Sequence, residues 1–436
     1  MNYNDWLKNK DLEYRDGILH FANVNVLELA EDLGTPIYIT NEQMIRKRYQ
    51  ELKNVLNSVY RDNRIYYAMK SNSNMAILKI LNSEGSNYDC SSIGEIYACL
   101  KSGISSDQII YTGNMFTNED FEFAVEKDIL INLDSYSQLI RLAKIYKKQG
   151  KEKNIISFRF NPEFGAGHHP HTITAGKKIK FGILENQIIQ VYSEARELGF
   201  KKFGIHQHIG SGIIDAYDFE KPTIKFLEII EKIAKTIGIQ FEFVDFGGGI
   251  GIPYHPEENP INLKKYSEIV LNKFKEVVEK GNIGNPILFI EPGRYISSES
   301  SILLTQINTI KDNGYKLFAG INAGFNTLIR PTLYGSYHHI IECKVQKAEN
   351  LKYDIVGPIC ESGDVLGYER KLSKLNEGDY LAILDTGAYG YTMSSPYNSR
   401  PRPAEFLIDK GKVHNIRSKE KFEDLLSYQT IPDHLK

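Results

Sequence analysis

Between about residue 60 and residue 295, short apolar, β-branched or aromatic runs alternate with segments whose apolar positions recur at helical spacing, such as 92–101 and 221–234. Each run ends in polar or glycine residues. The eight runs are 64–68, 87–90, 108–112, 129–133, 155–160, 203–208, 241–246 and 286–290. Because strands that alternate with helices form parallel sheets, eight such units predict an α/β fold, a (β/α)8 TIM barrel.

After residue 295 the pattern changes to β-like runs separated by turns, for example 301–308, 353–356 and 380–384. Such runs predict a C-terminal all-β domain, which part of the N-terminal segment joins. We therefore expect a barrel at 35–295 and a β domain built from 1–34 and 296–436.

Composition excludes several classes of protein. The chain has 436 residues, of which 42% are hydrophobic, and a formal net charge of −2. A chain this long and apolar buries a sizeable core, and its balanced charge predicts neither a nucleic-acid nor a membrane partner. No apolar run approaches the ~18–20 residues that span a bilayer, and residues 1–10 lack the apolar region of a signal peptide, so we expect a cytoplasmic protein. Four cysteines without Cys-x-x-Cys spacing predict neither disulfides nor a thiolate zinc site.

The carboxyl ends of barrel strands carry the chemistry of this fold, and here they are rich in functional groups. The residues after the eight runs include Lys70, His208, Gly247–Gly249, Glu291 and Arg294. An amine can form a Schiff base with an aldehyde, glycine N–H groups and an arginine can hold a phosphate, and a carboxylate can hold a proton on a pyridine nitrogen. Pyridoxal 5'-phosphate needs all of these groups.

Each group also has a simpler interpretation. A lysine after a strand is usually a solvated surface residue, and a lone histidine is usually structural. The triple glycine does not fit the dinucleotide-binding spacing, because the sixth position is Ile252 or Tyr254. The histidines of 168–171 and 338–339 lack metal-ligand helix spacing and an accompanying acidic pair, so we expect no metal site.

Seven motifs occur in the order seen in the alanine-racemase-like barrel decarboxylases that use pyridoxal phosphate, and the chain resembles this family from about residue 30 to 410. They are Tyr67-Ala-Met-Lys-Ser-Asn72, Gly204-Ile-His-Gln-His-Ile-Gly-Ser211, Asp245-Phe-Gly-Gly-Gly-Ile-Gly251, Glu291-Pro-Gly-Arg294, Ile329-Arg-Pro331, Cys360-Glu-Ser362 and Gly387-Ala-Tyr-Gly390. Within the family the chain is most similar to the diaminopimelate decarboxylases.

The resemblance implies a role for each matched residue. Lys70 would carry the cofactor, His208 would stack on its ring, Glu291 would pair with the ring nitrogen, and Cys360 would protonate the product. The cofactor-binding set would be Lys70, His208, Ser211, Gly248, Gly249, Glu291, Pro292, Gly293, Arg294 and Tyr389. The substrate-binding set would be Arg294, Arg330, Tyr334, Glu361 and Tyr389. In the family, the Cys360 and Tyr389 loops enter the other subunit's site, which implies a homodimer with shared active sites.

The substrate follows from a comparison within the resemblance. Relatives that act on ornithine, lysine or arginine have an acid where this chain has Ala323, whereas Arg330, Tyr334 and Glu361 match the residues that receive the second amino-acid centre of diaminopimelate. The implied reaction is meso-2,6-diaminopimelate to L-lysine and carbon dioxide, the last step of lysine biosynthesis. Three features depart from the usual pattern of that group: Asn322, Ser71 and the stretch 113–117.

The alternatives left open are a decarboxylase of ornithine, lysine, arginine or a carrier-bound or dicarboxylic amino acid, and a non-enzymatic pyridoxal-phosphate-binding regulatory protein. A racemase of this fold shares the cofactor but uses a tyrosine base in the second domain and has no equivalent of the Cys360-Glu361 loop, so it fits less well. A metal-dependent barrel hydrolase would need carboxylate and histidine ligands at the barrel mouth and also fits less well.

Overall fold

The computed structural model describes residues 2–152, 155–165, 167, 169, 174–346 and 348–436. The chain divides into two compact units. The barrel unit contains Ile45–Pro253 and Asn259–Ser297, and the β unit contains Met1–Met44, Tyr254–Glu258 and Ser298–Lys436.

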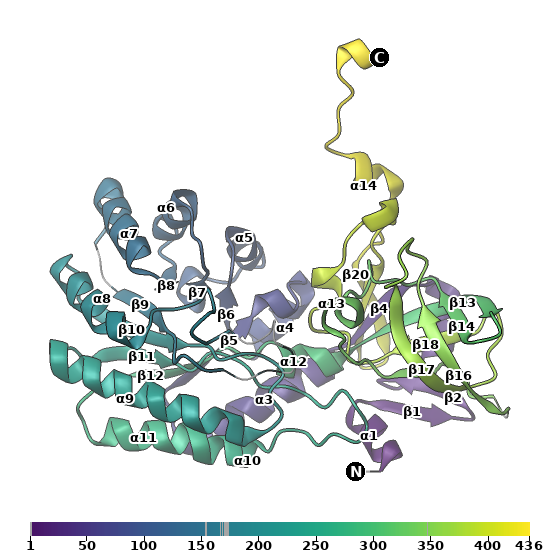
Figure 1. Cartoon of the computed structure of the whole chain (residues 1–436), viewed down its shortest axis with the longest axis horizontal. Coiled ribbons are helices and arrows are strands. Elements are labelled where there is room, and N and C mark those ends of the chain that lie inside the picture. Colours follow the sequence, from purple (N-terminus) through teal and green to yellow (C-terminus); the bar gives the residue numbers. More distant parts are fainter. Residues whose placement is uncertain (1, 153–154, 166, 168, 170–173, 347) are drawn as a thin grey trace. The chain divides into compact units, whose positions relative to one another are not determined.

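The core of the barrel unit is a closed ring of parallel strands, which confirms the predicted barrel (Figure 1). In ring order the strands are β5 (Asn63–Ala68), β6 (Asn87–Cys90), β7 (Ile109–Thr112), β8 (Leu130–Leu133), β9 (Ile155–Phe160), β10 (Lys202–Gln207), β11 (Phe241–Asp245) and β12 (Ile287–Ile290). Strand β12 pairs with β5 and closes the ring.

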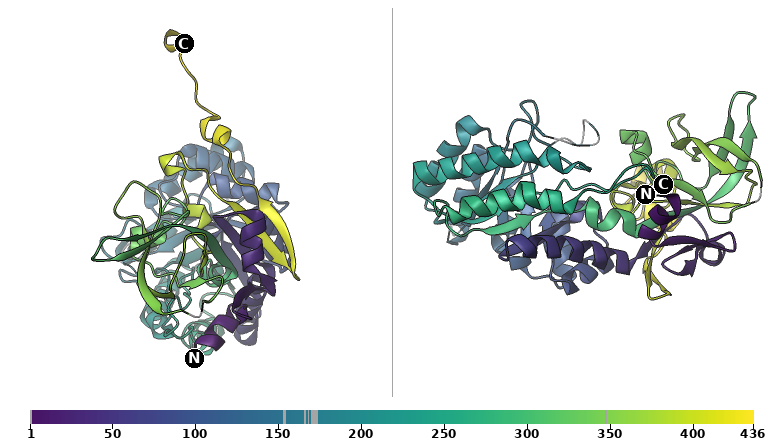
Figure 2. Two further views of the ribbon diagram at one scale, coloured as in Figure 1. Left: turned by 90° about the vertical axis from the view of Figure 1, so that its right-hand side faces the viewer. Right: turned by 90° about the horizontal axis from the view of Figure 1, so that it is seen from below.

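Helices surround the strands (Figures 1 and 2). They are α3 (Glu42–Val59), α4 (Met75–Ser83), α5 (Ile93–Lys101), α6 (Asn118–Glu126), α7 (Tyr136–Gln149), α8 (Glu185–Glu197), α9 (Glu220–Ile237), α10 (Leu263–Tyr266), α11 (Asn272–Glu279) and α12 (Arg294–Ser297). Their ends follow local sequence signals: the Ser92 side chain caps α5 and Gly238 ends α9 in a left-handed conformation. Both helices predicted from periodicity, α5 and α9, are present.

Aromatic rings fill part of the barrel interior. Phe243 and Phe289 stack with their ring centroids 4.5 Å apart, and Tyr66 packs on Phe289. A Cβ at Gly204 would lie 2.2 Å from the Phe243 ring, so only glycine leaves space for this stack. The barrel interior is apolar and packed around this stack, and the polar residues lie nearer the carboxyl ends of the strands.

The β unit contains a three-stranded sheet and a larger mixed sheet. The small sheet is β1 (Leu12–Arg15), β2 (Ile18–Phe21) and β3 (Val24–Asn25). The larger one contains β4 (Ile37–Asn41), β13 (Ser301–Asp312), β14 (Leu317–Ile321), β15 (Ile340–Glu342), β16 (Asn350–Val356), β17 (Val365–Ser373), β18 (Tyr380–Ile383), β19 (Ala404–Asp409) and β20 (Lys412–Arg417). Helices α1 (Tyr3–Asn9), α2 (Val26–Leu33), α13 (Arg330–Tyr334) and α14 (Phe422–Leu426) are additions to the predicted β architecture.

Strand β4 moves the expected boundary between the units. It pairs antiparallel with β13 and parallel with β19, in the middle of the larger sheet. The barrel unit therefore begins at Ile45 and not at residue 35. The segment Tyr254–Glu258, expected within the barrel, also belongs to the β unit. These partners are distant in sequence, so the apolar run at 37–41 alone does not reveal which sheet it completes.

A buried charge cluster ties the N-terminal helix to the β unit. Lys10 is 2% exposed, and its Nζ lies 2.7 Å from Glu299 Oε1 and 2.7 Å from Asp385 Oδ1. The ammonium also lies 4.7 Å from the centroid of the Trp6 ring. Burial lowers the pKa of Lys10, but the two carboxylates outweigh that effect and the pKa is raised.

Among the described residues, no helix is both long and apolar enough to cross a bilayer.

Candidate active site

Lys70 lies on the tight turn that follows β5. The turn is a single 3-10 turn, Met69–Ser71, and the Lys70 ammonium lies 2.5 Å from Asp89 Oδ2. Asp89 is the third residue of β6 and is fully buried. Burial and the charge of Glu291 raise the pKa of Asp89, Lys70 lowers it, and the net pKa is about 7. The sequence analysis did not single out Asp89, although a carboxylate within a short apolar strand was a usable signal.

Glu291 follows β12 and is held by side chains from two other strands of the ring, β10 and β7. Its Oε2 lies 3.1 Å from Nε2 of His206, and the Thr112 hydroxyl donates to Oε1 over 3.3 Å. Asp245, the last residue of β11, is also fully buried. Sequence reasoning missed His206 and Asp245, which lie within strands and not after them.

The two carboxyl groups differ in ionisation. Burial by itself raises the pKa of Glu291, but His206 and Lys70 stabilise its charge and the pKa falls well below the usual value. Burial and the neighbouring Glu291 charge raise the pKa of Asp245 well above the usual range. Of the two carboxyl groups, Glu291 therefore carries a negative charge more readily than Asp245.

The three glycines after β11 bring the backbone close to its neighbours. Gly247 and Gly249 have positive φ angles, and a Cβ at Gly247 would lie 2.4 Å from the Gln207 carbonyl oxygen. A Cβ at Gly248 would lie 2.3 Å from the Glu291 carbonyl oxygen. Side chains are thus excluded, and a ligand can approach the peptide groups directly.

The groups beside this glycine turn are a hydroxyl, a guanidinium and an imidazole. Arg294 donates from Nε and Nη2 to the Ser211 hydroxyl over 3.2 and 3.1 Å. The Gly248 N–H donates to Nδ1 of His208 over 3.1 Å, so that nitrogen carries no proton. Burial lowers the pKa of His208 well below its usual value, and its ring is neutral.

The Glu291-Pro-Gly-Arg turn packs against the Lys70 turn. The Ala68 N–H donates to the Pro292 carbonyl over 3.2 Å, and a Cβ at Gly293 would lie 3.0 Å from the Ser71 Cβ. Nine predicted site residues therefore gather at the carboxyl ends of the barrel strands: Lys70, His208, Ser211, Gly248, Gly249, Glu291, Pro292, Gly293 and Arg294.

The other five predicted residues are in the β unit, and Arg330 is the most constrained of them. It is 1% exposed, its Nη1 lies 2.8 Å from His338 Nε2, and its guanidinium carbon lies 4.9 Å from the Tyr254 ring centroid. His338 Nδ1 lies 2.8 Å from the Leu384 carbonyl, which can only accept, so Nδ1 carries the proton and Nε2 accepts from Arg330. His338 therefore orients an arginine. Sequence analysis had considered it only as a metal ligand.

Cys360 and Glu361 lie on an exposed loop. The Asp364 carboxylate holds this loop by accepting from the N–H groups of Ile359 and Phe325 over 2.7 and 2.6 Å. The Asn398 side chain accepts from the Cys360 N–H over 3.2 Å, and its Nδ2 lies 3.3 Å from the Cys360 sulfur.

Tyr389 and Tyr334 are half-buried. Tyr389 has a φ of 58° in the turn after Asp385, and the Gly387 N–H of that turn donates to the Ser298 carbonyl over 3.0 Å. Since Lys10 binds Asp385, the buried cluster also braces the loop that carries Tyr389. Tyr334 is the last residue of α13. Glu361 accepts from the Tyr397 hydroxyl over 2.7 Å.

The positions considered for substrate choice are tightly packed. Ala323 is fully buried. Asn322 accepts from the Thr305 hydroxyl over 2.7 Å and donates to the Thr35 hydroxyl over 2.8 Å, so its side chain links β13 and β14 to the segment before β4.

Metal binding has one candidate among the described residues. Ligand atoms of His206, Asp245 and Glu291 lie within 4.8 Å of one another. Of the histidines weighed from sequence, His338 binds Arg330, and His339 contacts Tyr3 and Tyr337. Positions 168, 170 and 171 lie outside the described residues.

Comparisons with known proteins agree with this geometry. Residues 42–298 match the family model described as pyridoxal-dependent decarboxylase, pyridoxal binding domain. A diaminopimelate decarboxylase of Methanothermobacter thermautotrophicus is 45% identical over 98% of this chain and 99% of its own, and one of Archaeoglobus fulgidus is 38% identical over 96% and 99%. The crystal structure of the Methanocaldococcus jannaschii diaminopimelate decarboxylase with L-lysine is similar with a TM-score of 0.92 at 34% identity, covering 99% of this chain and 100% of that one.

Proposed function

The chain belongs to the pyridoxal-dependent decarboxylases, and we propose that it converts meso-2,6-diaminopimelate into L-lysine and carbon dioxide with pyridoxal 5'-phosphate as its cofactor. The observation that carries the proposal is that the Lys70 amine, bound to Asp89, and the buried Glu291 carboxylate, bound to His206, both lie at the carboxyl ends of the barrel strands. The lysine-bound relative supports the identity of the product.

The residues present fit this cofactor. The glycine turn offers backbone N–H groups without side chains, because a Cβ at Gly247 or Gly248 would meet a neighbouring carbonyl oxygen, and Ser211 and Arg294 supply a hydroxyl and a positive charge for a phosphate. When bound, the cofactor supplies an aldehyde that joins an amine and a protonated pyridine ring that accepts the electron pair left by carbon dioxide. Glu291 would hold a proton on the ring nitrogen, because a buried carboxylate stabilises an adjacent cation. His208 would face the ring as a neutral imidazole.

Asp89 acts as the proton acceptor for the Lys70 ammonium. Its pKa of about 7 makes both of its forms available near neutral pH, and its Oδ2 already lies within hydrogen-bonding distance of the Lys70 Nζ. Lys70 must lose a proton before its nitrogen can attack a carbonyl, and Asp89 is placed to receive it.

Substrate selection rests on Arg330 and Ala323. The guanidinium of Arg330 matches a distal carboxylate in charge and in geometry, and His338 prearranges it. A fully buried alanine at 323 provides no acid for a distal ammonium or guanidinium. The pair therefore favours an amino acid with a second carboxylate over ornithine, lysine or arginine, with Tyr334, Glu361 and Tyr389 completing the contacts.

We further propose a homodimer with two shared active sites, in which Cys360 of one subunit delivers a proton at the site of the other. The exposed position of the Cys360-Glu361 loop supports this, because a thiol that acts on a substrate needs a second surface to enclose it. Asn398 holds the sulfur in place.

The test is a decarboxylation assay with meso-diaminopimelate, L-lysine, L-ornithine and L-arginine, with added pyridoxal phosphate and with Lys70→Ala as control. We expect rapid release of carbon dioxide, with L-lysine as the product, from meso-diaminopimelate, and at most a slow reaction of the other three amino acids. Activity only on a diamine or guanidino acid would refute the substrate. Cofactor binding without turnover of any of the four would favour a regulatory binding protein. Turnover that a chelator abolishes and zinc restores would favour a metal enzyme at His206, Asp245 and Glu291.

A further inference from the structure

The last eighteen residues form an extended arm. Residues 419–436 contain α14 and a 3-10 helix, Asp433–Leu435, and Figures 1 and 2 show this segment in yellow, projecting from the β unit. Its large apolar side chains are exposed: Phe422 (71%), Leu426 (60%), Tyr428 (100%), Ile431 (65%) and Leu435 (68%). Scattered exposed apolar residues are ordinary, but here five fall within fourteen consecutive positions.

The arm has defined local structure. The Asp424 carboxylate accepts from the Lys421 N–H over 2.7 Å at the start of α14, and the Gln429 N–H donates to the Leu426 carbonyl over 3.0 Å after its end. A single-turn helix of this kind is not stable in isolation, so it needs a surface on which to pack its apolar side chains.

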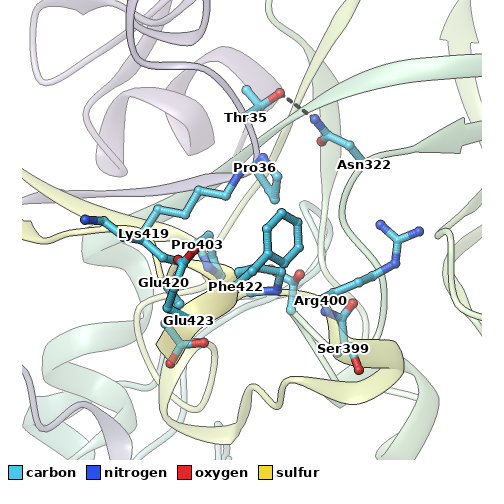
Figure 3. A pocket seen from close by; sticks show the side chains of 14 residues that line it. Thr35, Pro36, Asn322, Ser399, Arg400, Pro403, Lys419, Glu420, Phe422 and Glu423 are labelled. Atoms are coloured by element: carbon cyan, nitrogen blue, oxygen red, sulfur yellow. Dashed lines mark hydrogen bonds between the residues drawn. The ribbon is translucent and has the colours of Figure 1, made fainter. Parts of the chain in front are cut away.

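The base of the arm is anchored. Arg402 donates to Glu420 from its Nε over 2.6 Å and from its backbone N–H over 2.9 Å. Figure 3 shows a pocket of about 610 Å³ with Lys419 on one side, Arg400 and Asn322 on the other, and the Phe422 ring between Pro36 and Arg400. The arm therefore leaves the β unit from a fixed point at Glu420.

This base is close in sequence and structure to the loop assigned to the shared site. Arg400, in the pocket wall, lies two residues after Asn398, which bonds the Cys360 N–H. Arg400 Nη2 also lies 3.5 Å from the Pro358 carbonyl of the Cys360 loop. The arm thus begins beside the surface that the dimer proposal places against a second subunit.

We propose that residues 419–436 are a dimerisation arm, whose apolar side chains pack on a second copy of this chain. This inference rests on the proposed shared-site homodimer and adds the element that holds it together. At roughly 100–200 Å² per exposed large apolar side chain, one arm offers on the order of 700 Å² and two arms on the order of 1,400 Å², the size of a standard stable interface. The acidic residues Glu423, Asp424 and Asp433 disfavour an anionic membrane as the surface.

The experiment compares the full chain with one that ends at Ser418 and with the double variant Tyr428→Ser/Leu435→Ser. The matched control is Tyr315→Ser, which removes an equally exposed tyrosine (95%) from the β13–β14 turn. Sedimentation over a range of concentrations should show dimer dissociation at least about 100-fold easier for both arm variants and unchanged for the control. The visible absorbance of the Lys70-bound cofactor should persist in all of them, which shows that they are folded.

Activity per chain of the arm variants should fall on dilution and recover at high protein concentration. Cross-linking of an equal mixture of ¹⁴N and ¹⁵N chains should give heavy–light links from Lys421 or Lys436. Light–light and heavy–heavy links alone would place the arm on its own chain and overturn the proposal. A truncated chain that dimerises as strongly as the full chain would also overturn the proposal. The same conclusion would follow if the truncated chain dimerised again only after a third protein was added.

The two proposals fail differently. If the arm variants lose the dimer but the full chain has no decarboxylase activity, the arm proposal stands and the proposed function is refuted. A fully active monomeric full-length chain would refute the shared site, and with it the arm.

Discussion

Replacing Arg330 by alanine separates a role in substrate selection from a role in structure. The guanidinium is fully buried and contacts His338, Ser336 and the Tyr254 ring. If it meets the distal carboxylate of diaminopimelate, its loss leaves that carboxylate unpaired in a desolvated site, which typically costs ~2–5 kcal/mol. At ~1.4 kcal/mol per decade, kcat/KM for meso-diaminopimelate should fall by roughly 10²- to 10³-fold.

The same substitution also affects stability. Hydrogen bonds from a charged donor contribute ~1.5–3 kcal/mol each, and a desolvated cation–π contact ~2 kcal/mol, so Arg330→Ala should unfold several kcal/mol more easily. His338→Asn is the matched control, because it removes the imidazole that orients Arg330 and keeps the guanidinium. It should weaken stability by a smaller amount and lower kcat/KM by only about ten-fold or less.

The assay measures kcat/KM per cofactor-loaded molecule with meso-diaminopimelate and, in parallel, the slow decarboxylation of L-lysine, which lacks the second carboxylate. Arg330→Ala should lower the first rate constant and leave the second unchanged, so that selectivity collapses. Equal losses on both substrates, in proportion to the loss of folded protein, would refute the substrate role.

Three further predictions concern the two halves of the site. Lys70→Ala should abolish the visible absorbance of bound cofactor and nearly all turnover; a variant that keeps both contradicts the assignment. Mixing inactive Lys70→Ala and Cys360→Ala chains should restore part of the activity, because one hybrid site then has both residues; hybrid dimers without activity would argue against shared sites. The folded pKa of Asp89, about 7, exceeds its unfolded value of about 4, so its contribution to stability is complete below pH 4 and declines until about pH 7. Asp89→Asn should flatten that decline in denaturant titrations, and an unchanged pH profile would mean that Asp89 titrates normally.

Local pattern alone determined the barrel and much of its site. Strand and helix periodicity repeat over short stretches, and every predicted barrel run is a strand, from Asn63–Ala68 to Ile287–Ile290. The residues after those strands gather because parallel strands place their carboxyl ends on one side of the ring. Lys70, His208, Glu291 and Arg294 could therefore be grouped without a structure.

Tertiary structure alone decided the features that depend on partners far apart in sequence. A carboxylate within a strand, such as Asp89, or a lysine just after an N-terminal helix, such as Lys10, has no local mark of the group that it contacts, because its partners come from segments that meet only on folding. The same holds for β4, which pairs with strands more than 250 residues away, and for His338, whose role is defined by Arg330 and the Leu384 carbonyl. The sequence pattern indicates which face of a helix or strand is apolar. Only the folded structure shows which residues that face, or a charged side chain on it, contacts.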